Sequence, residues 1–268
     1  MNILVCLKQI LDPERPSRDF RVDAAAHEAE RGSAGLVMNI FCANALETAL
    51  QVREKVGGKI TVLTLGNASA EEVLRKAWSL KVDAAVHVKH DFPKRPNPFC
   101  VARILSAAIR KLGNFDLILT GRESGDWGDG QTGGLLAEEL KLPCFSFVDD
   151  IESNRPLAVL LRKQTDQGCE TWDVALPTVA TITNHKHNVP RIAKTRDVMQ
   201  AFKQPITTLS LTDIGLDEQA VADEQAAIEV VDLVIPVKQI HCEMVTGETL
   251  DDRITAFAKK IVATVQAG

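Results

Sequence analysis

The first half of the chain alternates short apolar runs rich in β-branched residues with segments of helical spacing, and this alternation restricts the fold more than any other feature. Strand–helix–strand units with short connections build a mostly parallel sheet, because their crossovers are right-handed and place helices on the faces. The expected strands are Ile3–Leu7, Ile60–Leu65, Ala84–Val88 and Leu117–Thr120, and the expected helices are Ala43–Val56, Val73–Leu80, Cys100–Leu112 and Gln131–Leu140. The pattern predicts an α/β fold, a mostly parallel sheet flanked by helices.

The pattern changes after Pro143. Three strand-like runs separated by turn residues predict an antiparallel β addition, and a fourth run is expected to return to the sheet. These runs are Phe145–Ile151, Leu157–Lys163, Cys169–Val174 and then Thr178–Thr183. A basic loop, an acidic stretch and an amphipathic helix around Leu250–Val265 follow, with little apolar material for a core of their own. We therefore expect a domain over 1–206 and a C-terminal arm over 207–268 that packs on another protein.

Composition narrows the class of protein. The net charge is −5 and aromatic residues make up 4% with no Tyr, so neither a basic stripe nor a base-stacking platform for nucleic acid is indicated. No apolar run has the length of a membrane span, and the N-terminus lacks the features of a signal peptide. The six Cys residues form no Cys-x-x-Cys pair, which excludes the usual zinc and iron–sulfur spacings. A protein of a reducing compartment, most simply the bacterial cytoplasm, is expected.

The segment from Asp116 to Gly134 is the most informative for chemistry. An apolar strand ends at Gly121, a glycine-rich loop follows, and a helix begins near Gln131. Glycines allow close approach of a ligand to the backbone, and free N–H groups at a helix start favour a phosphate. The residues by themselves leave two interpretations open, a phosphate-binding loop or a plain strand–helix connection. The loop matches neither a Walker A motif nor a clean G-x-G-x-x-G turn.

Other catalytic patterns are weak. The Ser residues lie in no Gly-x-Ser-x-Gly elbow, and His185 and His187 lie beside basic residues rather than acidic partners for a metal. Asp126 and Asp129 could act as paired carboxylates, although turn formation is the commoner role of Asp beside Gly. No catalytic residue and no metal site are predicted.

Several segments, taken in order, resemble the β subunit of electron-transfer flavoproteins nearly from end to end. The matching segments are Val5-Cys-Leu-Lys-Gln-Ile-Leu-Asp12, Met38-Asn-Ile-Phe-Cys42, Thr64-Leu-Gly66 before Glu71–Ala77, Gly121–Thr132 before Leu136–Leu140, Leu176-Pro-Thr-Val179, and Val189–Lys194 before Met199–Lys203. The resemblance implies a Rossmann-like domain in a heterodimer whose α subunit holds most of a redox FAD. It also implies a structural AMP in the β subunit, which a second FAD replaces in electron-bifurcating relatives.

The resemblance also implies the positions of the cofactor contacts. AMP contacts are expected at Cys6, Asn39, Leu65, Ser124, Gly130, Gln131 and Thr132, with Gly66, Gly121, Asp126 and Asp129 in the same segments and Phe41 near the flavin. The family's Tyr near the flavin corresponds to Pro13 here, so the resemblance does not extend to that contact. Thr132 is similar to the AMP-type version of the motif, since bifurcating members tend to carry Val there. AMP is therefore favoured over a second FAD.

The resemblance finally implies a docking segment for a donor dehydrogenase at 184–204. The docking residues are expected at Lys194, Thr195, Arg196 and Met199, and Thr195 stands where the family has an anchoring Leu. The implied role is electron transport from acyl-CoA dehydrogenases, as in fatty acid oxidation, through FAD to a quinone oxidoreductase. Two alternatives remain: a bifurcating subunit that oxidises NADH at a second FAD, and a nucleotide-sensing protein of the universal-stress type. The latter leaves the long tail unexplained.

Overall fold

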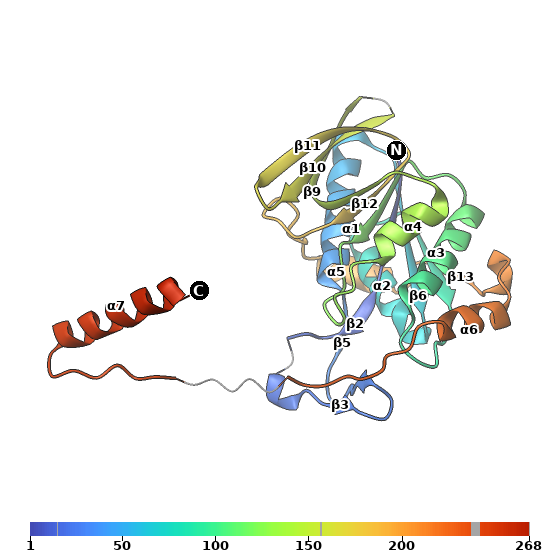
Figure 1. The fold of residues 1–268 in the computed structure, drawn as a ribbon. Coiled ribbons are helices and arrows are strands. Elements are labelled where there is room, and N and C mark those ends of the chain that lie inside the picture. Colours follow the sequence, from blue (N-terminus) through green and yellow to red (C-terminus); the bar gives the residue numbers. More distant parts are fainter. Residues whose placement is uncertain (15, 156, 237–241, 268) are drawn as a thin grey trace. The chain divides into compact units, whose positions relative to one another are not determined.

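The computed structural model describes residues 1–14, 16–155, 157–236 and 242–267, and it confirms the α/β class (Figure 1). Nine strands within those ranges form one sheet in the order β11-β10-β9-β12-β8-β1-β6-β7-β13. The strands are β1 (Asn2–Leu7), β6 (Lys59–Gly66), β7 (Ala84–Lys89), β8 (Leu117–Gly121), β9 (Cys144–Arg155), β10 (Ala158–Thr165), β11 (Gly168–Ala175), β12 (Thr178–Ile182) and β13 (Thr207–Leu209). The pairs from β9 through β12, β8, β1, β6 and β7 to β13 are parallel.

The central strand β1 explains why the sheet carries helices on both faces. Its side chains alternate, so Ile3, Val5 and Leu7 pack into one buried cluster with helices α1 (Ile40–Val56) and α2 (Glu71–Ser79). Leu4 and Cys6 point into a second cluster with α3 (Pro98–Leu112) and α4 (Thr132–Leu140). The apolar run Ile3–Leu7 is therefore buried on both sides, as parallel strands usually are.

Local chemistry sets the helix ends. Asn97 caps α3 by accepting a hydrogen bond from the Cys100 N–H at 2.8 Å, and Pro98 occupies the first helical position, where no N–H is needed. Gly57 follows α1 with a φ of +74°, a conformation that favours glycine, and its N–H donates to the Arg53 carbonyl at 2.8 Å. These ends lie within a few residues of the positions predicted from the sequence.

The antiparallel addition is also confirmed. β9 runs parallel to β12, and β10 and β11 then pair antiparallel beyond it at the edge of the sheet. Smaller elements, which the periodicity did not predict, surround the sheet. They are the paired strands β2 (Gln9–Leu11) and β5 (Leu36–Met38), the paired strands β3 (Val22–Asp23) and β4 (Glu28–Ala29), the 3₁₀ turns η1 (Ser17–Asp19), η2 (Ala68–Ala70) and η3 (Thr212–Ile214), and helices α5 (Thr195–Ala201) and α6 (Glu218–Ala226).

The chain divides after Leu233 rather than at the expected boundary after residue 206. β13 pairs with β7 in the main sheet, and Leu209, Ile214 and Val221 are buried in the α3 and α4 cluster. The segment from 207 to 233 thus completes the core of the domain instead of belonging to an arm. The second unit, 234–268, contains α7 (Leu250–Ala267).

Candidate functional site

The predicted cofactor residues gather at the carboxyl edge of the parallel strands. β1 ends at Leu7, β6 at Gly66 and β8 at Gly121, and the chain leaves each strand at this edge. Ligands of open α/β sheets bind at such an edge, where helix N-termini also converge. The helices that start here are α1, after Asn39, and α4, after Gln131. The fold thereby brings together segments that lie far apart in the sequence.

Gly121 and Asn39 lock the start of the glycine-rich loop onto α1. A Cβ on Gly121 would lie 2.9 Å from the backbone carbon of Phe41, so only glycine permits this approach. Asn39 is buried, and its Nδ2 donates to the Glu123 carbonyl at 2.8 Å while its Oδ1 accepts from the Gly125 N–H at 3.1 Å. The Asn39 side chain therefore holds the loop and forms no cap on α1.

Lys8 fastens the middle of the loop. Its Nζ lies 2.9 Å from both carboxylate oxygens of Asp126 and 3.1 Å from the Ser124 Oγ. Burial disfavours the charged carboxylate, but the Lys8 charge and the hydrogen bonds from Ser124 and Lys8 outweigh it and lower the pKa of Asp126 below its ordinary value. Two predicted cofactor residues, Ser124 and Asp126, thus have direct partners within the protein, and both orient the loop.

The other loop carboxylates are also paired with cations. Asp129 forms an ion pair with Arg95, and Glu123 forms one with Arg122 at 2.7 Å. Because Asp126 and Asp129 each bind a different cation, they do not form the paired carboxylates of an acid–base site. No group of His, Cys, Asp and Glu in the described ranges has the arrangement of a metal site. The sequence did not predict Lys8 and Arg95, because only the fold brings them to this loop. Arg122 lies within the loop and was not predicted either.

The start of α4 has the features of a phosphate cradle. Gly128 and Gly130 have φ values of +68° and +65°, and Gln131 at the helix start makes no capping hydrogen bond with its side chain. A Cβ on Gly133 would lie 2.4 Å from the Thr181 Cγ2, so glycine lets the helix pack tightly on the sheet. Gly134 has open space at its Cα. The first turn of α4 therefore offers uncapped N–H groups, bare backbone and the Gln131 and Thr132 side chains, which fits a phosphate.

The remaining predicted residues line the edge less directly. Cys6 is buried in β1, and this burial, together with the neighbouring Cys42, raises the pKa of its thiol to about 12, so the thiol is neutral. Leu65 packs against the α3 and α4 cluster, and Gly66 closes β6, where a Cβ would lie 3.1 Å from the Ala70 Cβ. Phe41 is half-buried, and the Arg122 guanidinium stacks 4.6 Å from its ring centre. Leu65 and Phe41 are thus partly exposed, whereas Cys6 is buried.

The predicted docking segment, 184–204, is held rigidly at its beginning. Asn188 is buried, and its Nδ2 donates to the Thr183 carbonyl at 2.9 Å. Arg191 forms two hydrogen bonds of 2.8 Å with the buried carboxylate of Glu47, and its bonds to Glu47 and Glu54 raise the pKa of its guanidinium. This part of the segment is fixed onto α1.

Its outer surface is apolar and basic. Ile192 is 95% exposed, and Met199 and Phe202 are exposed as well. Lys194, Thr195 and Arg196 are exposed as expected. Sequence reasoning missed Ile192 and Phe202 because periodicity does not distinguish an exposed apolar side chain from a core one. Thr195 stands where the resemblance implies an anchoring Leu, and this surface carries other large apolar side chains.

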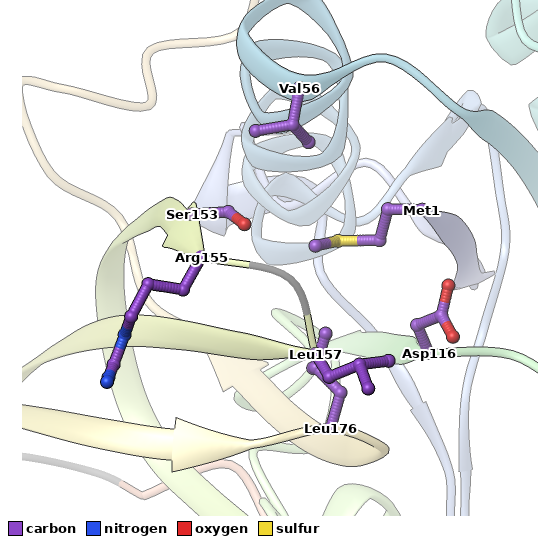
Figure 2. A pocket seen from close by; sticks show the side chains of 7 residues that line it. All are labelled: Met1, Val56, Asp116, Ser153, Arg155, Leu157 and Leu176. Carbon is purple, nitrogen blue, oxygen red and sulfur yellow. The ribbon is translucent and has the colours of Figure 1, made fainter.

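A hollow of about 450 Å³ lies at the opposite end of the sheet, away from these residues. Its lining residues are Met1, Val56, Asp116, Ser153, Arg155, Leu157 and Leu176 (Figure 2). The polar groups there are already engaged, since Asp116 accepts from the Asn2 N–H at 2.6 Å and Arg155 pairs with Asp173. We assign no function to this hollow.

Comparison with known proteins identifies the family of the chain. The model of the electron transfer flavoprotein domain matches residues 29–214, which contain the glycine-rich loop and the whole docking segment. The chain belongs to the electron transfer flavoprotein family. It is 30% identical to the caffeyl-CoA reductase-Etf complex subunit CarD of Acetobacterium woodii, over 97% of this chain and 98% of that protein. It is also 28% identical to the electron transfer flavoprotein subunit beta of Bacillus subtilis, over 100% and 98%, and 32% identical to that of Mycobacterium leprae, over 85% and 86%.

Membership gives the chain the role of an electron-carrier subunit of a flavoprotein, with an α subunit as its partner. No helix in the part of the chain that the structure describes combines the length and apolar character needed to cross a membrane.

Proposed function

We propose that this chain binds AMP as a structural nucleotide in a heterodimer whose α subunit holds most of the FAD. The observation that carries the proposal is the uncapped first turn of α4, which follows a loop fixed by Asn39, Lys8 and Arg95. A loop that is already ordered before the ligand binds loses little entropy on binding. Its glycines and free N–H groups suit a phosphate, and the partly exposed Leu65 and Phe41 offer apolar surface to the rest of a nucleotide.

The bound FAD would supply the one-electron chemistry, and the residues of this chain would bind and orient the nucleotide and the partners. We propose that electrons come from a dehydrogenase of the acyl-CoA type and pass to a quinone oxidoreductase. The proposed docking surface consists of Ile192, Lys194, Arg196, Met199 and Phe202. Apolar side chains on a rigid loop gain affinity from burial, and the flanking cations favour a partner pocket with an acidic rim.

We propose that the second unit binds the α subunit. Leu250, Ile254, Phe257, Ile261 and Val265 of α7 recur at helical spacing and are all exposed, as are Val231 and Val234 before them. An apolar stripe of this kind normally marks an interaction surface. The chain expressed alone should be poorly soluble or unstable, and co-expression of the α subunit should rescue it. A monodisperse, cooperatively folding chain whose melting the α subunit leaves unchanged would contradict this assignment.

We propose the cytoplasm as the compartment, because all six cysteines, each within the described ranges, are free thiols. The second candidate function is an electron-bifurcating subunit with a second FAD in place of AMP. The observation that favours it is the similarity to the caffeyl-CoA reductase-Etf complex subunit. Thr132 favours AMP, since bifurcating members tend to carry Val there.

Extraction and mass identification of the nucleotides in the purified heterodimer separate the two functions. AMP with one FAD supports the proposal, and two FAD molecules support the alternative.

A further inference from the structure

Arg95 reaches from the connection between β7 and α3 to the glycine-rich loop. Its guanidinium lies 3.9 Å from the centre of the Trp127 ring and forms an ion pair with Asp129. Its side chain is 22% exposed, so this contact is largely covered. Trp127 and Asp129 lie within the part of the loop that has no regular structure, just before the start of α4. A single side chain therefore holds the end of the loop by both stacking and charge.

The backbone of Arg95 is itself fixed by two other elements. Its N–H donates to the Oε1 of Glu28 in β4 at 2.9 Å, and its carbonyl accepts from the Gln225 Nε2 of α6 at 2.6 Å. The Gln225 Oε1 accepts in turn from the Asn97 N–H at 2.8 Å. The backbone of Arg95 is thus fixed, so its side chain loses little further conformational entropy when it contacts the loop.

We propose that Arg95 is a positioning residue that keeps the glycine-rich loop in the conformation that presents the first turn of α4 to the nucleotide, with α6 as its brace. The inference rests on the proposed AMP site. Lys8 holds Asp126 and Arg95 holds Asp129, so the loop is fastened on either side of Trp127. Gly128 lies between Asp126 and Asp129, and Gly130 follows Asp129. Both glycines give the loop freedom to open when one of the two ion pairs is removed. Loss of Arg95 should therefore speed nucleotide exchange and lower the melting temperature of the heterodimer only slightly.

The test is the exchange rate of radiolabelled AMP in the co-expressed heterodimer, with FAD content and melting temperature measured in parallel. Arg95→Gln should exchange AMP about tenfold faster, as expected from losing an ion pair and a cation–π contact together. Arg95→Lys should fall between the wild type and Arg95→Gln, because it keeps the charge and loses the planar stacking. The matched control is Arg110→Gln in α3, since Arg110 donates to the Glu139 carbonyl at the far end of α4, away from the glycine-rich loop.

Asp129→Asn and the double variant Arg95→Gln/Asp129→Asn test whether Arg95 acts through the loop. If it does, the double variant should exchange AMP more slowly than the product of the two single effects predicts. The inference would be overturned if the effect of the double variant on the exchange rate equalled the product of the two single effects. An Arg95→Gln exchange rate equal to that of Arg110→Gln would also overturn it. Wild-type heterodimer that contains no AMP and takes up none would instead refute the proposed AMP site, so the two failures are distinguishable.

Discussion

Gly133 and Gly134 are neighbours in the first turn of α4, and we predict opposite outcomes when each becomes alanine. A Cβ on Gly133 would lie 2.4 Å from the Thr181 Cγ2 and 2.7 Å from the Thr120 Oγ1, distances that real Cβ atoms do not show. A Cβ on Gly134 meets nothing within 4 Å. Because both positions are helical, alanine gains the same helix propensity at each. The difference in stability between the two variants therefore reports the steric contact at Gly133.

Overpacking a tight contact costs about 1–3 kcal/mol, and alanine regains about 1 kcal/mol over glycine in a helix. Gly133→Ala should therefore destabilise the protein by up to about 2 kcal/mol, whereas Gly134→Ala should stabilise it by about 0.4–1 kcal/mol. Because α4 must move away from the sheet, Gly133→Ala should also lower AMP retention. The assay is thermal melting of the co-expressed heterodimer, with the extracted nucleotide quantified. Equal melting of the two variants, or a stabilised Gly133→Ala, would refute the packing of α4 described here.

Further predictions concern the phosphate, the docking surface and the loop. Thr132→Val removes one hydroxyl donor and should weaken AMP retention about tenfold, since a hydrogen bond to a charged group is worth about 1.5–3 kcal/mol; unchanged AMP after dialysis would refute the contact. Lys194→Glu with Arg196→Glu should slow electron transfer from the donor dehydrogenase at low salt and remove most of its salt dependence, and unchanged kinetics with intact FAD would place docking elsewhere. Because Lys8 lowers the pKa of Asp126, their stabilisation is present above the ordinary carboxyl pKa of about 4 and is lost as the pH falls through the lowered value. Lys8→Met should therefore destabilise the heterodimer at neutral pH and not in acid, as melting at both pH values would check.

The layered fold could be predicted because each strand and helix is marked by the residues of its own segment. The apolar runs around β1 and β8 mark buried strands, and the spacing in α2 and α3 marks their buried faces. Helix α6 was missed because only Val221 of it is buried, so its sequence lacks an apolar stripe. The edge strand β13 was missed because three residues give no periodicity, although its pairing with β7 fixes 207–233 to the domain.

The sequence indicated the glycine-rich loop of the candidate site but not the residues that contact this loop. Glycines before a helix start are a local signal of close approach, and within the protein Gly121 packs closely on Phe41 and Gly133 on Thr181. The partners of the loop are non-local, since Lys8 and Asn39 lie far from residues 123–126 in the sequence. Nothing in the neighbouring residues of Arg95 indicates its contact with Trp127 and Asp129. Such contacts depend on how the strands are ordered in the sheet.

The central claim is that the carboxyl edge of this sheet holds AMP within a flavoprotein heterodimer. The most direct measurement is the nucleotide content of the co-expressed, purified complex, obtained by denaturation, chromatography and mass spectrometry together with the visible flavin spectrum. We predict one AMP and one FAD per heterodimer. A complex with two FAD molecules and no AMP, or with no adenine nucleotide besides a single FAD, would contradict the claim.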